Sequence, residues 1–146
     1  SEEDRLSLLN GLKDGTIDII ATDHAPHSLE EKSKGLSDSL MGVSGLEVSF
    51  PLIYTYLVKS GIISLKKAME LMWINPCKRF KINQPFIVGA VANFAVWDID
   101  NKYKIKGNEF LSKGKITPFE NYDVYGKCIM TMVNGRFKWI NNSIEK

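Results

Sequence analysis

The first residues of the chain carry the pattern of an amphipathic helix followed by a short strand. The acidic start, 1–4, supplies an N-cap and negative charge for a helix N-terminus. Leucines recur every third position from 6 to 12, which predicts one buried stripe, and Gly11 and Gly15 predict the helix end. The run 17–21 is apolar and rich in isoleucine, so it predicts a buried parallel strand.

The middle of the chain predicts a long loop and two helices. The polar stretch 22–45 is punctuated by glycines and indicates a loop of the kind that often carries function. Apolar residues return at helical spacing over 46–58, where Pro51 predicts either a kink or the start of the helix proper. A second helix is predicted over 65–74, ended by the Asn-Pro pair at 75–76.

Patterns typical of β-strands dominate the second half. Short apolar runs predict strands over 86–91 and 93–98. Two more predicted strands, 127–133 and 136–140, flank the Asn-Gly pair at 134–135. Asn-Gly between such runs is the strongest short-range signal for a hairpin. We therefore expect this half to form a small antiparallel β unit.

Composition excludes several classes of protein but does not indicate a specific function. The chain has 146 residues, 44% of them hydrophobic, and a formal net charge of +2. It can bury a core, and it lacks the basic character of proteins that bind nucleic acids or anionic membranes. No apolar run approaches the roughly 20 residues of a membrane span. Cys77 and Cys128 form no CxxC pattern, so we expect a reduced, cytoplasmic protein without a disulfide framework.

The residues best suited to chemistry directly follow the first predicted strand. Asp23, His24 and His27 lie in the string Thr-Asp-His-Ala-Pro-His at 22–27, and catalytic groups of α/β folds lie at the C-terminal ends of parallel strands. A carboxylate there can ligate a metal ion or move a proton, and imidazole can ligate zinc or bind an anion. A loop cap held by hydrogen bonds is an equally open interpretation. A catalytic zinc site needs three protein ligands, and two histidines without an HxH motif do not complete one.

The string at 22–27 belongs to a longer motif, Gly-Thr-Ile-Asp-Ile-Ile-Ala-Thr-Asp-His-Ala-Pro-His, over 15–27. Further segments match one family in the same order: 30–32, 45–47, 50–52, 75–76, 89–92, 97–98, 110–115, 117–119 and 132–135. Together these motifs closely resemble class I dihydroorotases of the amidohydrolase superfamily. The sister dihydropyrimidinases and allantoinases typically differ after the Asp-His pair.

This resemblance implies an α/β fold. It implies the last strand and helices of a TIM (β/α)8 barrel over 1–80, followed by the C-terminal part of a small β domain over 81–146. The family binds two zinc ions per active site through an HxH motif, a carboxylated lysine, two further histidines and an aspartate. Only the aspartate lies in this chain. We therefore expect a C-terminal fragment, or one of two pieces of a cleaved enzyme, that is inactive without the missing N-terminal barrel portion.

The resemblance also assigns roles to individual residues. Asp23 would be a zinc ligand and the catalytic proton shuttle. His27 would bind the substrate carboxylate, with a simple loop hydrogen bond as the alternative. Met41 and Gly42 match the place where the family has Pro-Phe-Gly, whose backbone contacts substrate. Gly42 is retained, whereas Leu40 and Met41 depart from that pattern.

The function implied is that of a dihydroorotase of de novo pyrimidine biosynthesis. Such an enzyme reversibly hydrolyses the cyclic amide of dihydroorotate to N-carbamoyl-aspartate with the help of zinc. One alternative is another cyclic amidohydrolase, similar to dihydropyrimidinase or hydantoinase. The other is a non-catalytic paralogue that binds aspartate transcarbamoylase. A homo-oligomer or a complex with aspartate transcarbamoylase is compatible with the family, and we expect no nucleic-acid or membrane partner.

Overall fold

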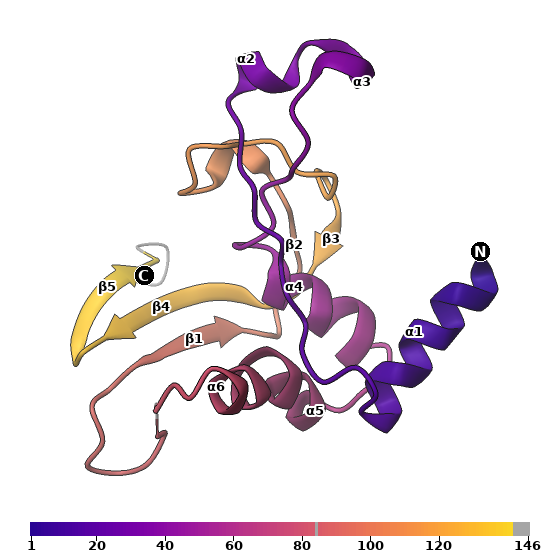
Figure 1. Cartoon of the computed structure of the whole chain (residues 1–146). Coiled ribbons are helices and arrows are strands. Elements are labelled where there is room, and N and C mark those ends of the chain that lie inside the picture. The colour runs from indigo at the N-terminus through magenta and orange to yellow at the C-terminus, as the bar shows by residue number, and fades with distance from the viewer. Residues whose placement is uncertain (84, 142–146) are drawn as a thin grey trace.

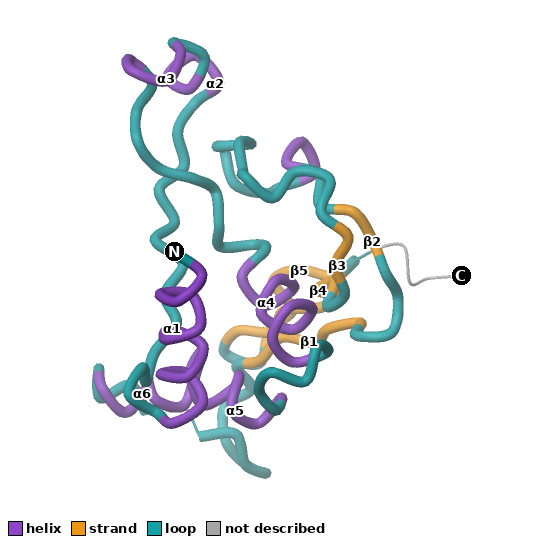
Figure 2. The backbone as a smooth tube through the Cα atoms, turned by 90° about the vertical axis from the view of Figure 1, so that its right-hand side faces the viewer, coloured by secondary structure: helices purple, strands orange, loops and turns teal. Residues whose placement is uncertain are grey.

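Helices make up the N-terminal half of the chain and strands the C-terminal half. One long loop of the N-terminal half, 22–45, projects away from the other elements (Figure 1). The computed structural model describes residues 1–83 and 85–141. The projecting loop carries the short helices α2 (Leu29–Lys32) and α3 (Gly35–Asp38). It extends away from the helices and the sheets in both views (Figure 2).

Helix α1 (Glu2–Asp14) begins and ends through local interactions. The Ser1 hydroxyl accepts a hydrogen bond from the Asp4 amide at 3.2 Å, and the Asp4 carboxylate accepts one from the Ser1 amino group at 2.9 Å. Gly15 ends the helix in the left-handed conformation, with φ at 91°. Gly11 lies buried inside the helix, where a Cβ would be 3.2 Å from the Ile17 side chain. The prediction that Gly11 helps to end the helix is therefore wrong.

The predicted leucine stripe of α1 is only partly buried. Leu12, near the helix C-terminus, packs against a hydrophobic core. Leu9 is half-buried, and Leu6 is 48% exposed. The N-terminal turns of α1 extend beyond the other helices (Figure 1), so their leucines find few neighbours among the described residues.

The segment 17–21, predicted as a buried strand, forms no strand. Its three isoleucines are half-buried and Asp18 is exposed, and the Ile20 amide donates a hydrogen bond to the Leu71 carbonyl at 3.1 Å. A parallel strand needs neighbouring strands that pair with its edges. No described residue pairs with this segment as a strand, so its apolar side chains are buried only by packing against the helices.

The first predicted helix of the middle region begins later than its apolar pattern. Helix α4 (Ser49–Ile53) continues directly into the π-helical segment η1 (Tyr54–Val58). Pro51 therefore lies in the first turn, where backbone N–H groups have no partner within the helix and the missing N–H of proline costs nothing. Of the two outcomes predicted for Pro51, the start of the helix is the one observed.

The second helix of this region runs through the Asn-Pro pair that was expected to end it. Ser64 caps helix α5 (Leu65–Met69), as its side chain accepts a hydrogen bond from an amide of the first turn. The π-helical segment η2 (Glu70–Ile74) and helix α6 (Asn75–Arg79) follow without a break. The helical region thus extends five residues past the predicted boundary, to position 79.

The π-helical turn explains how the helix passes Pro76. The Asn75 amide donates to the Glu70 carbonyl, five residues back, instead of to the carbonyl four residues back. A π-helical turn shifts the hydrogen-bond register of the helix. Pro76 follows directly and has no N–H to donate. The wider turn therefore falls where the regular pattern would have been interrupted.

Two antiparallel sheets form the C-terminal half. The larger sheet has the strand order β1-β4-β5, and β2 pairs with β3 in the smaller one. A single 3-10 turn, η3 (Gly107–Glu109), follows β2. The strands are β1 (Phe94–Asp98), β2 (Tyr103–Lys104), β3 (Asp123–Val124), β4 (Lys127–Val133) and β5 (Arg136–Ile140).

The predicted hairpin is confirmed, whereas the predicted strand at 86–91 is wrong. Asn134 and Gly135 connect β4 and β5 with φ values of 52° and 71°, as a type I′ turn requires. The segment 86–91 instead contains a turn, in which the Ala90 amide donates to the Ile87 carbonyl at 3.1 Å. Its apolar side chains are exposed and pair with no strand of the described chain.

Two hydrophobic clusters form the core, and the helix made of α4 and η1 contributes to both. The first consists of Val48, Ile105, Phe110 and Val124, and the second of Ile53, Ile63, Ala68 and Leu71. Among the described residues, no helix is long and apolar enough to cross a membrane.

We predict that Leu71→Ala strongly destabilises the protein. Leu71 is fully buried in the second cluster, and removing a buried leucine side chain costs about 2–5 kcal/mol through lost burial and a residual cavity. Urea unfolding measures the change. Leu65→Ala on α5 is the matched control, because Leu65 is 42% exposed. Equal losses for the two variants would contradict the assigned core.

Candidate active site

The loop 22–45 holds the predicted site residues, and it folds back on itself. Its two arms meet at a parallel bridge between His24 and Val43, where the Ala25 amide donates to the Val43 carbonyl at 3.0 Å. Farther out, the Leu40 amide donates to the Glu31 carbonyl at 3.2 Å. The short helices α2 and α3 form the tip between the arms (Figure 1).

Helix α2 is fixed by a capping box between Ser28 and Glu31. The Ser28 hydroxyl accepts a hydrogen bond from the Glu31 amide at 3.2 Å, and the Glu31 carboxylate accepts from the Ser28 amide at 2.8 Å. The Ser28 amide and the Ser28 hydroxyl both donate to the Glu31 carboxylate, and these two hydrogen bonds hold the pKa of the Glu31 carboxyl below its usual value. The capping interaction is therefore complete at neutral pH and weakens only as acid protonates Glu31.

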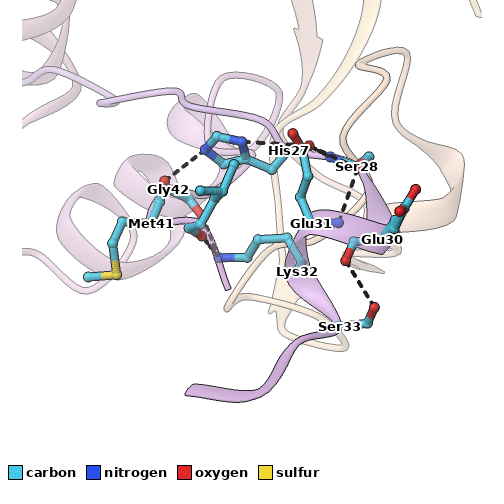
Figure 3. A network of polar contacts seen from close by, with 9 residues as sticks. His27, Ser28, Glu30, Glu31, Lys32, Ser33, Met41 and Gly42 are labelled. Atoms are coloured by element: carbon cyan, nitrogen blue, oxygen red, sulfur yellow. Dashed lines mark hydrogen bonds and ion pairs between the residues drawn. The ribbon is translucent and has the colours of Figure 1, made fainter. Parts of the chain in front are cut away.

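Three of the four predicted site residues lie together on this loop. His27 Nε2 is 2.8 Å from the Met41 carbonyl oxygen, and Gly42 follows directly (Figure 3). Since a carbonyl only accepts, His27 carries a proton on Nε2. His27 Nδ1 lies 3.8 Å from the Glu31 carboxylate, which becomes an ion pair when the ring is protonated. The hydrogen bond within the loop, expected as the alternative role of His27, is present.

Gly42 is required by its surroundings. Its φ of 129° lies in a region that L-amino acids other than glycine rarely adopt. A Cβ at this position would also lie 2.5 Å from the Ala25 carbonyl oxygen and 3.2 Å from the His27 ring. Gly42 therefore lets the two arms of the loop approach each other beside His27.

Asp23 lies on the same loop but takes no part in these contacts. Its side chain is exposed, and no hydrogen bond or ion pair joins it to another described residue. Its φ of 45° is left-handed, a conformation that Asp tolerates better than most residues. The structure thus presents a carboxylate without a partner at the end of the segment 17–21.

His24 has a structural task. Its Nδ1 accepts hydrogen bonds from the amides of Gly45 and Leu46, both at 3.2 Å. The lone pair on Nδ1 is therefore occupied and cannot ligate a metal ion. These two bonds fix the chain where the loop leads into α4.

The described residues do not form a metal site of their own. No three side chains from histidine, cysteine, aspartate and glutamate gather among residues 1–83 and 85–141. Catalytic zinc is held by three protein ligands, and Asp23 offers one carboxylate.

A second loop, 110–116, supports the His27 loop, a contact that was not predicted from the sequence. The buried Ser44 hydroxyl donates to the Gly114 carbonyl at 2.7 Å, and the Ser44 amide donates to the Ile116 carbonyl at 3.0 Å. A Cβ on Gly114 would lie 2.5 Å from Pro26 Cβ and 3.0 Å from the His27 backbone. The partners are 70 or more positions apart in the sequence, so no local pattern predicts their contact.

Glu47 anchors this supporting loop. Its carboxylate accepts hydrogen bonds from the amides of Leu111 and Ser112, at 2.8 and 2.9 Å. Charge-assisted bonds of this kind are stronger than those between neutral groups. Glu47 immediately precedes the core residue Val48, so the bonds connect the supporting loop to the start of the α4–η1 helix.

A cavity of about 540 Å³ lies apart from the predicted site, between the strands of the β unit. Trp97, Tyr103 and Trp139 are among its lining residues, and none of the four predicted site residues is. Burial raises the pKa of Tyr103 to about 12, so its phenol stays protonated at neutral pH.

Comparison with known proteins points to the same family as the motif at 22–27. The sequence pattern of the Amidohydrolase family matches residues 1–138. The chain belongs to this family. It is 44% identical over 140 residues to a dihydroorotase of Staphylococcus aureus (strain Mu50), a match that covers 95% of this chain and 33% of the relative. A dihydroorotase of Brevibacillus brevis is 45% identical over 142 residues, which cover 97% of this chain and 33% of the relative.

Solved amidohydrolase structures resemble the chain over a similar share of their length. The L-hydantoinase from Arthrobacter aurescens matches 94% of this chain with a TM-score of 0.84 and 34% identity. A dihydropyrimidinase from Brevibacillus agri matches 90% with a TM-score of 0.82, and at 22% identity it supports the fold alone. The matches cover 32% and 30% of those two chains. This amidohydrolase chain thus spans about a third of its curated relatives and structural neighbours.

We predict that Gly114→Ala destabilises the packing of the two loops. The added methyl group would collide with Pro26 and the His27 backbone, and overpacking of this kind costs about 1–3 kcal/mol. Urea unfolding measures the loss, and hydrogen exchange of the segment 24–43 locates it. Lys113→Ala is the neighbouring control because Lys113 is exposed. A Gly114 variant as stable as this control would disprove the contact.

Proposed function

We propose that this chain is the C-terminal third of a dihydroorotase, the enzyme that reversibly hydrolyses the cyclic amide of dihydroorotate to N-carbamoyl-aspartate. The observation that carries the proposal is the 43–45% identity to proteins named dihydroorotase over 92–97% of the chain. The string Asp-His-Ala-Pro-His at 23–27 adds to it, since the resemblance ties this string to dihydroorotases rather than to their sister enzymes.

The proposal assigns residues 1–80 to the last part of a TIM barrel and residues 81–146 to part of a small β domain. The segment 17–21 supports the first assignment, because it is rich in isoleucine and has no strand partner among the described residues. Further strands beside it, from parts of the protein outside this chain, would complete a parallel sheet. The antiparallel sheets β1-β4-β5 and β2-β3 support the second assignment.

In this proposal Asp23 carries the proton transfer. A hydroxide derived from water attacks the ring carbonyl of dihydroorotate, and the C–N bond of the ring breaks. Asp23 accepts the proton released at the attacking oxygen and passes it to the departing nitrogen. A carboxylate that is exposed and without an ion-pair partner is free to make both contacts.

Zinc dependence is part of the proposal, but Asp23 alone cannot hold the metal. Members of the amidohydrolase family are generally metal-dependent, and bound zinc lowers the pKa of water so that hydroxide forms near neutral pH. No three potential metal ligands gather among the described residues, and in this proposal Asp23 supplies one carboxylate. The other ligands must come from parts of the protein outside this chain.

His27 would bind the carboxylate of the substrate together with the backbone of Met41 and Gly42. In the structure its Nε2–H donates to the Met41 carbonyl, so substrate binding requires an exchange of partners. A carboxylate is the stronger acceptor, because hydrogen bonds to ionised groups are roughly twice as strong as those between neutral groups. The substrate anion can therefore displace the carbonyl from His27.

A hydantoinase or dihydropyrimidinase activity is the second candidate. The L-hydantoinase from Arthrobacter aurescens, 34% identical to this chain, favours it. Assays of the native protein on dihydroorotate, hydantoin and dihydrouracil separate the candidates. Preferred turnover of dihydroorotate is expected. Preferred turnover of either other ring would replace the dihydroorotase proposal with the second candidate.

We predict that Asp23→Asn in the native protein lowers kcat by about 10²–10⁴-fold, because the amide cannot relay a proton. Thermal unfolding should remain close to wild type, since the Asp23 side chain is exposed and no hydrogen bond or ion pair joins it to the described residues. Asp38→Asn, on the exposed tip of the same loop, is the control and should retain activity. Near-normal kcat for the Asp23 variant would remove this residue from the catalytic role.

We also predict that the isolated chain does not turn over dihydroorotate, even with added zinc. Its described residues supply no cluster of metal ligands, and catalytic zinc requires three. The assay uses a homogeneous preparation of residues 1–146, with the native protein as the positive control. Turnover that coelutes with the isolated chain would show that it is not an incomplete part of the enzyme.

A further inference from the structure

Lys32 and His27 together hold three successive backbone carbonyls of the site loop. Lys32 Nζ donates to the Leu40 carbonyl at 2.8 Å and to the Gly42 carbonyl at 3.0 Å. His27 donates to the carbonyl between them, that of Met41. The Lys32 side chain reaches from α2 toward these carbonyls on the opposite arm (Figure 3).

Besides these bonds, the segment 40–42 is held by the hydrogen bond from the Leu40 amide to the Glu31 carbonyl at 3.2 Å. Leu40 and Met41 are 47% and 87% exposed, and Gly42 has no side chain. Hydrophobic packing therefore contributes little to the position of this backbone, and polar contacts must fix it. An ammonium group donating to carbonyls makes charge-assisted bonds, each worth more than a neutral hydrogen bond.

The two carbonyls held by Lys32 flank the one held by His27. When His27 turns from Met41 to a substrate carboxylate, the Met41 carbonyl loses its partner. The Leu40 and Gly42 carbonyls remain bound to Lys32, so the backbone on both sides stays in position. Lys32 itself is held, because its carbonyl accepts a hydrogen bond from the Ser39 hydroxyl at 3.0 Å.

We propose that Lys32 is a positioning residue, which keeps the 40–42 backbone in its binding geometry while His27 exchanges the Met41 carbonyl for the substrate carboxylate. This inference rests on the proposed function for its substrate and on the geometry of the loop for its mechanism. It assigns Lys32 no contact with the reacting atoms. Its effect should therefore fall on substrate affinity rather than on the chemical step.

Hydrogen exchange of the native protein tests the geometric part. Lys32→Met keeps the length and apolar stem of the side chain but removes its donors, so the segment 24–43 should exchange about tenfold faster. Lys34→Met is the matched control: it removes the same charge two residues away, from a side chain with no hydrogen bond to the loop backbone. Lys32→Arg should restore slow exchange, since its fork can reach both carbonyls.

Steady-state kinetics on dihydroorotate tests the functional part. Lys32→Met should raise KM about tenfold and leave kcat within about twofold of wild type, and Lys32→Arg should recover most of the affinity. Equal exchange in the Lys32→Met and Lys34→Met proteins would overturn the inference. So would faster exchange with unchanged KM. A native protein without dihydroorotate turnover would instead overturn the proposed function, and with it the substrate role of Lys32.

Discussion

The helix formed by α4 and η1 is the element on which the rest of the structure depends, because it packs against both hydrophobic clusters. Leu52 faces the cluster of the β unit, and Ile53 and Leu57 belong to the helical cluster. Just before the helix, the Glu47 carboxylate accepts hydrogen bonds from two amides of the loop 110–116. The position of that loop relative to the helices is thus set by one continuous segment. Because the same loop supports the backbone at His27, the stability of the core and the geometry of the candidate site are coupled.

The site loop obeys a different constraint, since its backbone polar groups must find partners without a sheet. Beyond the single bridge at His24, its arms are joined by isolated hydrogen bonds. A capping box closes α2, and Lys32 and His27 occupy the carbonyls of 40–42. Buried or crowded backbone groups left without partners would cost free energy comparable to a lost hydrogen bond. Side chains with donors therefore do here what neighbouring strands do in the β unit.

The features that the sequence predicted well are those that short segments encode. The hairpin at 134–135 follows from Asn-Gly chemistry, and the Ser64 cap is equally local. The failures have non-local causes. The segments 17–21 and 86–91 have the composition of strands, but a strand exists only when another strand pairs with it. Likewise Lys32 and Gly114 could not be assigned a role, because their partners are set by the folded loops rather than by spacing along the chain.

The two proposed catalytic and binding residues, Asp23 and His27, differ in how many contacts fix them, and the difference fits the tasks proposed for them. Asp23 is exposed and in a left-handed conformation, and no hydrogen bond or ion pair to the described part of the chain must be broken before it acts. His27 is held between Met41 and Glu31, and its neighbours are held in turn by Lys32 and by the loop 110–116. A group that relays a proton must change partners during each turnover, whereas a group that binds an anion can exchange one partner for another while its backbone stays in place. The proposed proton transfer would thus use a carboxylate without a partner among the described residues, and the proposed anion recognition a histidine whose backbone is supported by two loops of the same region.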